Sequence, residues 1–197
     1  MDQGVFKFDK EVHSFNNGEI LYYPNFFSND YLAVLKEELN WQSDNIRMFG
    51  KVHPIPRLHC WYADSNVFYE YSNINLKHNH WNELLLDIKA SVEDIVEERF
   101  NGMLGNYYRN GEDYVSWHSD DEESLGERPT VACASFGVSR VLSFRNKASK
   151  EKFSLSLDNR SLLVMLPPTQ NDWEHQISKS KLINEERVSL TFRFVHQ

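Results

Sequence analysis

The chain has 197 residues and a mass of 23.3 kDa, with 41% hydrophobic and 14% aromatic residues. This length supports one substantial hydrophobic core and is short for two, so we expect residues 1–197 to form a single domain. The 21 Lys and Arg residues against 29 Asp and Glu residues give a formal net charge of -8, which opposes general adhesion to polyanions. Any nucleic-acid contact would therefore need a local basic patch.

The N-terminal segment 1–15 carries charges throughout and lacks the apolar core of a signal peptide. No run in the chain approaches 18 consecutive apolar residues. The two cysteines, Cys60 and Cys133, lie far apart without CxxC spacing, which predicts neither a disulfide framework nor a thiolate zinc site. We therefore expect a cytoplasmic, monomeric protein that does not contact a membrane.

Two amphipathic helices are predicted in the first half. The first follows the capping residues 28–30 and has apolar residues at helical spacing up to Leu39. Residues 40–56 then predict irregular or hairpin structure around Gly50, and residues 57–71 have the β-branched and aromatic bias of strands. The second helix is predicted from Trp81 to about Glu98, with its apolar residues at Leu84, Leu85, Ile88, Val92 and Val96.

The second half changes to short β-like runs with polar connections. These runs cover residues 105–108, 131–136, 141–145, 153–157, 161–166 and 188–195. Helices followed by such a block predict a mixed α+β, mainly β fold, namely a double-stranded β-helix (jelly roll) with supporting N-terminal helices.

A candidate metal site begins at His118 and Asp120. In an extended segment, residues two apart project from the same face, so the imidazole and the carboxylate can reach one cation. His175 supplies a possible third ligand. Two imidazoles and one carboxylate leave open positions on an octahedral ion, which is typical of non-haem iron(II) that binds a cosubstrate and dioxygen. Chance occurrence of this motif and a hydrolytic zinc site are the alternatives.

A candidate carboxylate site lies near the C-terminus. Arg187 and Arg193 are six residues apart on a predicted strand, so both point to one face among apolar neighbours. A buried guanidinium needs an anion, and a dicarboxylate between the metal and the arginines would satisfy both. Internal salt bridges with Asp or Glu are the alternative. Asn106 and Tyr108 share a strand face and could add an amide and a phenol to the same pocket.

These motifs together resemble the AlkB dioxygenases, whose members oxidatively remove alkyl groups from nucleic-acid bases. The order and spacing match across roughly residues 45–195, through the segments 106–111 (NYYRNG), 118–122 (HSDDE), His175, and Arg187 with Arg193. The segments 47–51 (RMFGK), 56–57 (PR) and 134–137 (ASFG) also resemble the duplex-DNA-repairing branch. By this resemblance, about residues 1–100 form an N-terminal extension and nucleotide-recognition part, and about residues 101–197 form the jelly-roll catalytic core.

The resemblance implies Fe(II) as the metal, 2-oxoglutarate as cosubstrate and O2 as oxidant. His118, Asp120 and His175 would be the catalytic metal ligands. Arg187 would bind the distal carboxylate of 2-oxoglutarate and Arg193 would assist near the metal-bound end. The further cosubstrate contacts would be Asn106, Tyr108 and Ser189. Ser189 stands where the family usually has Asn, so one hydrogen bond to the cosubstrate is expected to be absent or replaced by water.

The resemblance also implies substrate contacts. Tyr71, with Tyr69 close by, would stack the damaged base against His118, and the acidic pair Asp121 and Glu122 would meet its exocyclic edge and positive charge. Phe49 would be an intercalating finger that fills the gap left by a flipped base; packing of its ring into the core is the alternative. Arg57 is also expected to contact the substrate. Strong duplex binding would require the basic residues to share one face: Arg47, Lys51, Arg57, Arg109 and Arg145.

The predicted function is oxidative demethylation of 1-methyladenine and 3-methylcytosine in alkylated DNA, coupled to decarboxylation of 2-oxoglutarate to succinate and release of formaldehyde. This would be a DNA alkylation repair activity. A single-stranded or RNA substrate is an alternative, since the chain is acidic. The sequence is also compatible with hydroxylation of protein side chains or of a small molecule, and with a binding module that has no turnover.

Overall fold

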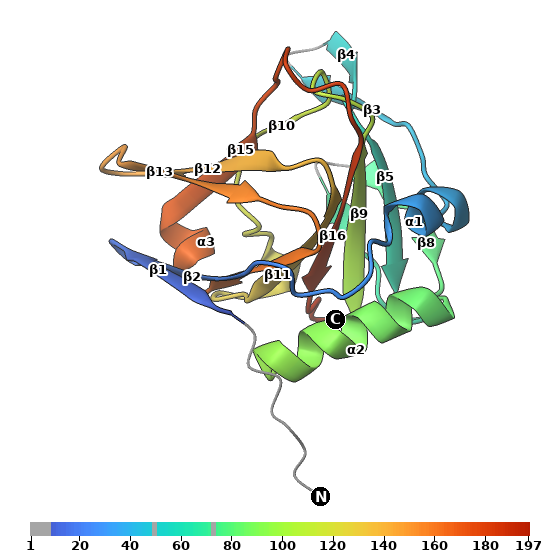
Figure 1. Cartoon of the computed structure of the whole chain (residues 1–197), viewed down its shortest axis with the longest axis horizontal. Helices are drawn as coiled ribbons and strands as arrows, with labels where there is room; N and C mark the ends of the chain where they lie inside the picture. Colours follow the sequence, from blue (N-terminus) through green and yellow to red (C-terminus); the bar gives the residue numbers. More distant parts are fainter. Residues whose placement is uncertain (1–8, 49–50, 72–73) are drawn as a thin grey trace, which may run out of the picture.

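The computed structural model describes residues 9–48, 51–71 and 74–197. The body of the protein is two β-sheets that face each other, as Figure 1 shows. The larger sheet has eight strands in the order β1-β2-β14-β11-β16-β9-β5-β8, and the smaller has four in the order β10-β15-β12-β13. Each sheet takes four of the consecutive strands β9 to β16, which is the alternation of a jelly roll, and the predicted fold is confirmed.

The strands of this core begin after the second long helix. Their bounds are β9 Gly102–Tyr108, β10 Val115–His118, β11 Val131–Gly137, β12 Arg140–Asn146, β13 Lys152–Leu157, β14 Ser161–Leu166, β15 Trp173–Ile177 and β16 Arg187–Arg193. A short 3-10 helix, η1, covers Glu123–Leu125, and α3 covers Thr169–Asp172. All pairings within the core are antiparallel.

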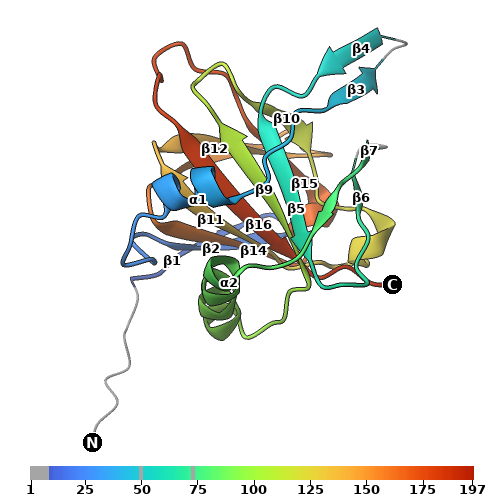
Figure 2. The same ribbon diagram turned by 90° about the vertical axis from the view of Figure 1, so that its right-hand side faces the viewer.

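The N-terminal elements extend the larger sheet and cover its outer side. They are β1 Glu11–Phe15, β2 Gly18–Tyr23, α1 Leu32–Glu38, β3 Asn45–Met48, β4 Lys51–Pro54, β5 Leu58–Ala63, β6 Glu70–Tyr71, β7 Ile74–Asn75, β8 His78–Asn79 and α2 Glu83–Val96. The β3–β4 hairpin projects from the body, and the β6–β7 hairpin lies below it in Figure 2. Both predicted helices and the predicted hairpin within residues 40–56 are confirmed.

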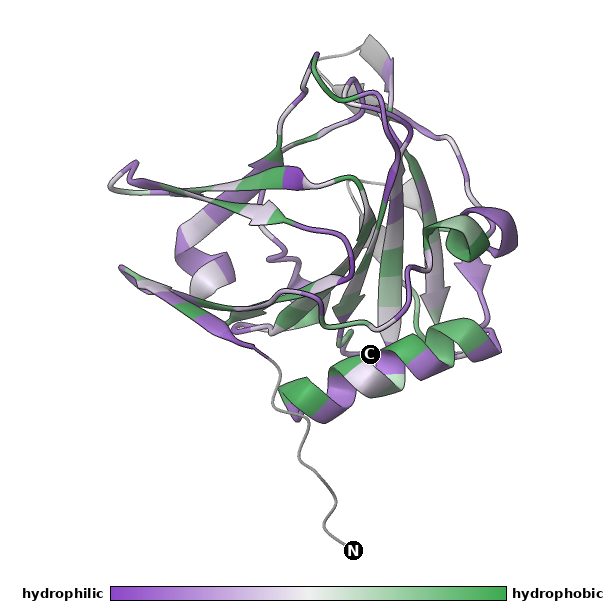
Figure 3. Cartoon of the chain, in the orientation of Figure 1, coloured by the Kyte–Doolittle hydropathy of each residue, from purple (hydrophilic) through white to green (hydrophobic). Residues whose placement is uncertain are grey.

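Helix α2 packs its apolar side against the larger sheet, which Figure 3 shows as a green stripe turned inward. Its buried Leu85, Ile88 and Val92 share one hydrophobic cluster with Met103 and Phe192 of the sheet. The helix starts where Asn82 Oδ1 accepts the backbone N–H of Leu85 at 2.9 Å, an N-cap that satisfies an otherwise unpaired donor. No helix among the described residues is long and apolar enough to cross a membrane.

The sequence pattern missed six strands, among them the short β7 and β8. Strands β1 and β2 pair at the edge of the larger sheet, and β10 and β15 pair in the smaller one. Strands β10 and β15 line a cavity with His118 and His175 beside the apolar Val115 and Ile177, so the histidines interrupt their apolar pattern. His175 therefore lies on a strand, β15, whereas the sequence placed it only beyond the strand-like run that ends at Leu166.

Candidate active site

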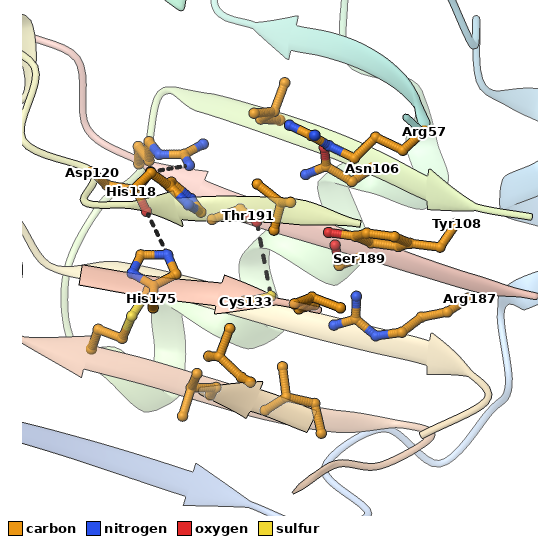
Figure 4. Close-up of a pocket in the computed structure, with 18 residues that line it drawn as sticks. Arg57, Asn106, Tyr108, His118, Asp120, Cys133, His175, Arg187, Ser189 and Thr191 are labelled. Carbon is orange, nitrogen blue, oxygen red and sulfur yellow. Dashed lines mark hydrogen bonds and ion pairs between the residues drawn. The ribbon is translucent and has the colours of Figure 1, made fainter. Parts of the chain in front are cut away.

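A pocket lies between the two sheets and has two chemically different ends, as Figure 4 shows. At one end, His118, Asp120 and His175 come together; at the other, Arg187 lies beside Tyr108 and Ser189. Thr191 and Cys133 line the space between these ends, and several aliphatic side chains complete the wall. The pocket thus combines a possible cation site with a possible anion site.

The two histidines meet because β10 and β15 are paired. His118 and His175 are register partners, and their ring centroids are 4.2 Å apart. An irregularity in the register between Val115 and His118 marks the end of β10, beyond which the chain turns and brings in Asp120. His175 Nε2 lies 3.9 Å from Asp120 Oδ2. The structure therefore gathers the three side chains that the sequence selected.

Each of the three has a neighbour that fixes its orientation. His118 Nδ1 lies 2.8 Å from the carbonyl oxygen of Ser116, so this nitrogen carries the proton and Nε2 keeps its lone pair. Asp120 Oδ1 accepts from Arg193 Nη2 at 2.6 Å, and the Asp120 backbone N–H donates to Gln170 Oε1 at 2.9 Å. Asp120 Oδ2 is buried and has no hydrogen-bond partner in the described part of the chain. A free imidazole nitrogen and a free carboxylate oxygen are therefore available as ligands.

The protonation states suit metal binding at neutral pH. Burial would raise the pKa of Asp120, but the Arg193 charge, with His175 and His118, lowers it to about 2. Burial, reinforced by His118, lowers the pKa of His175 to about 3, and burial also lowers the pKa of His118. The carboxylate is thus ionised and both imidazoles are neutral, which are the forms that bind a metal.

The side chains of His118, Asp120 and His175 lie close together but do not have the geometry of a complete metal site. Among the described residues, no group of three or more His, Cys, Asp or Glu side chains meets the geometry of a ready metal site. Their chemistry nevertheless fits an iron(II) ion, because two neutral imidazoles and one carboxylate with a free oxygen lie on one side of a cavity. The ligand roles of His118, Asp120 and His175 stay predictions.

The other end of the pocket holds a buried cation that is only partly paired. Arg187 is 1% exposed; its Nη2 donates to Ser135 Oγ at 2.8 Å, while Nε and Nη1 have no partner among the described residues. Its Cζ lies 5.2 Å from the centroid of the Tyr108 ring. A buried guanidinium with two free N–H groups is costly unless an anion reaches it. A carboxylate between Arg187 and the triad would satisfy it, so the geometry fits 2-oxoglutarate.

The other predicted cosubstrate residues also line this pocket: Asn106, Tyr108, Ser189 and Arg193. Arg193 is 3% exposed and its Nε and Nη1 lack partners in the described chain. Ser189 is a register partner of both Asn106 and Ser135, so Ser189 lies in the pocket wall between two polar neighbours. These cosubstrate roles also stay predictions.

Arg57 differs from its expected role as a substrate contact. Its side chain is buried, its Nε donates to Asn106 Oδ1 at 2.6 Å, and its Nη1 donates to the carbonyl of Tyr114 at 3.3 Å. Because these bonds hold the guanidinium in the pocket wall, Arg57 is not free to reach a nucleic acid. We reassign it to positioning Asn106.

The predicted substrate contacts divide into two groups. Tyr69 is 4% exposed, and its ring stacks on that of Trp61 with centroids 4.8 Å apart. Glu122 lies near the Tyr69 hydroxyl. Burial raises the pKa of Glu122; the charge of Arg193 opposes this shift and that of Asp120 reinforces it. Asp121 is exposed and pairs with Lys147 at 2.9 Å. The structure describes only the backbone of Tyr71, and Phe49 lies outside the described residues. Tyr69 therefore supports the site from within the core rather than offering a free stacking face.

Three of the five basic side chains predicted to bind a duplex are not free to form a binding face. Arg109 donates to both carboxylate oxygens of Asp113 at 2.8 Å, Arg145 pairs with Glu174 at 2.7 Å, and Arg57 is buried. Each of these charges is already matched or removed from the surface. The concentration of positive charge that strong duplex binding requires is therefore absent from these three described positions.

Arg140 was not identified from the sequence, and its hydrogen bonds connect segments on different sides of the pocket. It is 2% exposed and donates to three carbonyl oxygens, those of Asn110 at 3.2 Å, Asp113 at 3.0 Å and Ser178 at 2.8 Å. Its Cζ lies 5.5 Å from the centroid of the Tyr108 ring. One cation thus connects β12, the loop before β10 and the segment after β15, and it flanks the same tyrosine as Arg187.

Replacing Arg140 by methionine is expected to lower the free energy of unfolding by about 1–3 kcal/mol, because three carbonyls lose a charged donor. The KM for 2-oxoglutarate should also rise, since Tyr108 and the loop before β10 lose their support. Urea unfolding and cosubstrate kinetics measure the two effects. Arg140→Lys should recover part of both, and Val141→Ala, an exposed neighbour on the same strand, is the control. Unchanged stability in Arg140→Met would contradict this role.

Comparisons with known proteins agree with this geometry. The model of the 2OG-Fe(II) oxygenase superfamily matches residues 19–193. The chain is 40% identical over 175 residues to alpha-ketoglutarate-dependent dioxygenase alkB homolog 3 of Homo sapiens, covering 84% of this chain and 60% of that protein. It is 35% identical over 156 residues to DNA oxidative demethylase ALKBH2 of Homo sapiens, covering 75% and 60% respectively. Both relatives are similar to this chain, so these identities do not assign it to one branch.

The chain spans 52% to 60% of the length of the four alkB homolog 3 proteins that it matches. Among solved structures, OsALKBH1 superposes with a TM-score of 0.67 at 11% sequence identity, covering 93% of this chain and all of that one. At this identity the likeness shows a shared fold alone.

Proposed function

We propose that this chain, which belongs to the AlkB-type dioxygenases of the 2OG-Fe(II) oxygenase superfamily, removes alkyl groups from damaged bases in single-stranded DNA. One observation carries the proposal. A single pocket joins a His-Asp-His group to a buried arginine with two unpartnered N–H groups, so a metal and a dicarboxylate can bind side by side. The names of the relatives, a dioxygenase and a DNA oxidative demethylase, support the substrate class.

When bound, Fe(II) with 2-oxoglutarate and O2 would supply the oxidation that hydroxylates the alkyl carbon. A hydroxylated methyl group is then lost as formaldehyde, which restores the base, and 2-oxoglutarate is converted to succinate and carbon dioxide. The protein orients and encloses these reactants. Ser116 keeps the His118 imidazole turned with Nε2 free, and Arg193 holds Asp120 through Oδ1 so that Oδ2 stays available. Arg187 would set the distance at which the distal carboxylate binds.

The acidic group near the pocket suits a cationic base. Glu122 lies two residues after Asp120 and near the Tyr69 hydroxyl, so a carboxyl group stands beside the pocket. 1-Methyladenine and 3-methylcytosine carry a positive charge, so both would be attracted to an acidic site and could donate to Glu122.

Single-stranded DNA is favoured over duplex by the charge distribution. The net charge is -8, and Arg57, Arg109 and Arg145 are buried or ion-paired. These three side chains can therefore form few phosphate contacts and would give duplex opening little electrostatic support. A single strand exposes its bases already, so the cost of flipping a base out of a stack is smallest there.

The test is to mix the purified protein anaerobically with Fe(II) and 2-oxoglutarate, admit air, and measure succinate and formaldehyde. The substrates are 3-methylcytosine oligonucleotides, single-stranded and duplex, with unmethylated strands as the control. We expect formaldehyde that depends on the methyl group, with higher kcat/KM for the single strand. Succinate without formaldehyde would keep the dioxygenase and reject the nucleic-acid substrate. Faster turnover of the duplex would reject the strand preference.

A further inference from the structure

Phe68 is an aromatic side chain that the proposed reaction leaves without a role. It is 73% exposed, although burying a phenylalanine side chain stabilises a protein by about 1.5–3 kcal/mol. His78 lies 6.4 Å from it between ring centroids, and His80 lies 5.0 Å from His78. Lys77 is exposed in the same strand region. We call Phe68, His78 and His80 the aromatic platform.

A hollow of about 410 Å³ opens beside the platform. Phe68 and His78 line it together with Trp61, Tyr69, Leu76 and Ser124. Trp61 and Tyr69 are 1% and 4% exposed, whereas Phe68 is 73% exposed, so Phe68 supplies most of the accessible ring surface beside the hollow. The hollow therefore offers apolar ring surface to a planar ligand.

The hollow adjoins the candidate active site through Tyr69. One side of its ring stacks on Trp61 with centroids 4.8 Å apart, and Arg193 Cζ lies 5.8 Å from its centroid. Arg193 in turn donates to Asp120. Tyr69 and Arg193 thus lie between the hollow and the triad, so the two sites are near neighbours.

We propose that the aromatic platform and its hollow bind the nucleobase next to the alkylated one on the same strand. This inference rests on the proposed function and adds a contact to it. A nucleobase matches this surface, because its faces stack on aromatic rings such as the exposed ring of Phe68. Lys77, which is exposed, would supply a positive charge for the adjoining phosphate. Stacking needs no basic surface, so this contact supplies affinity that a chain of charge -8 lacks.

The platform also bears on strand preference. In a duplex, the faces of the neighbouring base are already stacked on other bases, so they cannot stack on Phe68 without disrupting the helix. A single strand can turn that base onto the platform. The proposal therefore predicts a contact that acts on single strands and not on duplexes.

The test measures binding rather than turnover. Fluorescently labelled pentanucleotides with a central 3-methylcytosine are titrated with the protein, Fe(II) and 2-oxoglutarate under anaerobic conditions, and Kd is read from polarisation. Two further pentanucleotides lack the base on the 5′ or the 3′ side of the lesion. We expect Phe68→Ala to raise Kd for the intact strand about tenfold, the size of one base stack. Removing the flanking base that stacks on the platform should raise the wild-type Kd by the same factor as Phe68→Ala does. Removing it should not raise the Kd of Phe68→Ala any further.

The controls are Phe68→Trp, which should keep tight binding, and Leu182→Ala, which removes a 92% exposed side chain outside the platform and should change nothing. Equal Kd values for wild type and Phe68→Ala would contradict the proposal. It would also be contradicted if the losses of affinity caused by Phe68→Ala and by removal of the flanking base were additive. These outcomes are separate from the proposed function, because binding is measured without oxygen. Wild-type protein that makes no methyl-dependent formaldehyde yet shows the coupled loss would keep the platform and reject the demethylase.

Discussion

Replacement of His118 by alanine is expected to abolish turnover of 2-oxoglutarate while leaving the protein folded. His118 lies at the end of β10 and its side chain bonds to the Ser116 carbonyl alone among the described hydrogen bonds, so its removal disrupts little packing. As a ligand, however, it supplies one of three bonds to the metal. Succinate release should fall to background and Fe(II) binding by calorimetry should be lost, with Tm within about 4 °C of wild type.

The matched control is Asp121→Ala, one residue from Asp120, whose side chain is exposed and pairs with Lys147. It should retain Fe(II) binding and basal turnover. Iron-dependent succinate release by His118→Ala at the wild-type rate would remove this histidine from the ligand set.

Asp120→Ala should differ from His118→Ala in stability. Its Oδ1 accepts from Arg193 at 2.6 Å, and both side chains are almost fully buried. Removing one partner of a buried ion pair leaves an uncompensated charge, which costs about 3–5 kcal/mol. We therefore expect loss of activity together with a fall in the free energy of unfolding, measured with urea. Equal stability of the two alanine variants would contradict the pairing of Asp120 with Arg193.

The fold was predictable where a segment has one apolar side. Helix α2 shows its buried Leu85, Ile88 and Val92 at helical spacing, and β16 shows apolar residues between its two arginines. Strands β10 and β15 carry His118 and His175 instead, because the cavity that they line is polar at that end. In β15 the buried positions still alternate, but His175 interrupts the apolar set between Trp173 and Ile177, which weakens the signal on which strand prediction depends.

The candidate site was predictable where residue type and spacing are unusual. The pair of arginines on one strand face, and the His-x-Asp motif, each indicate a chemistry from the order of residues alone. Arg57 and Arg140 could not be placed in this way, since one bonds to a side chain and the other to backbone carbonyls that are distant in sequence. Phe68 likewise has no spacing signal, and its exposure is visible only in three dimensions.

Replacement of Arg187 by methionine is expected to raise the KM for 2-oxoglutarate at least about 30-fold, the effect of losing a buried charge pair worth about 2–5 kcal/mol. The same variant should be more stable than wild type without cosubstrate, by about 1 kcal/mol, because a 1% exposed guanidinium with two unpartnered N–H groups is replaced by an apolar side chain of similar length.

Thermal unfolding with and without 2-oxoglutarate separates these two effects. Saturating cosubstrate should raise the Tm of wild type, since a ligand that binds only the folded state at 100 times its Kd adds about 2.7 kcal/mol of stability. The Tm of Arg187→Met should rise much less. Arg187→Lys keeps the charge but loses the planar fork, so its KM should lie between the two. A wild-type KM in Arg187→Met would place the distal carboxylate elsewhere, whereas lower stability without cosubstrate would mean that Ser135 and Tyr108 already compensate the buried charge.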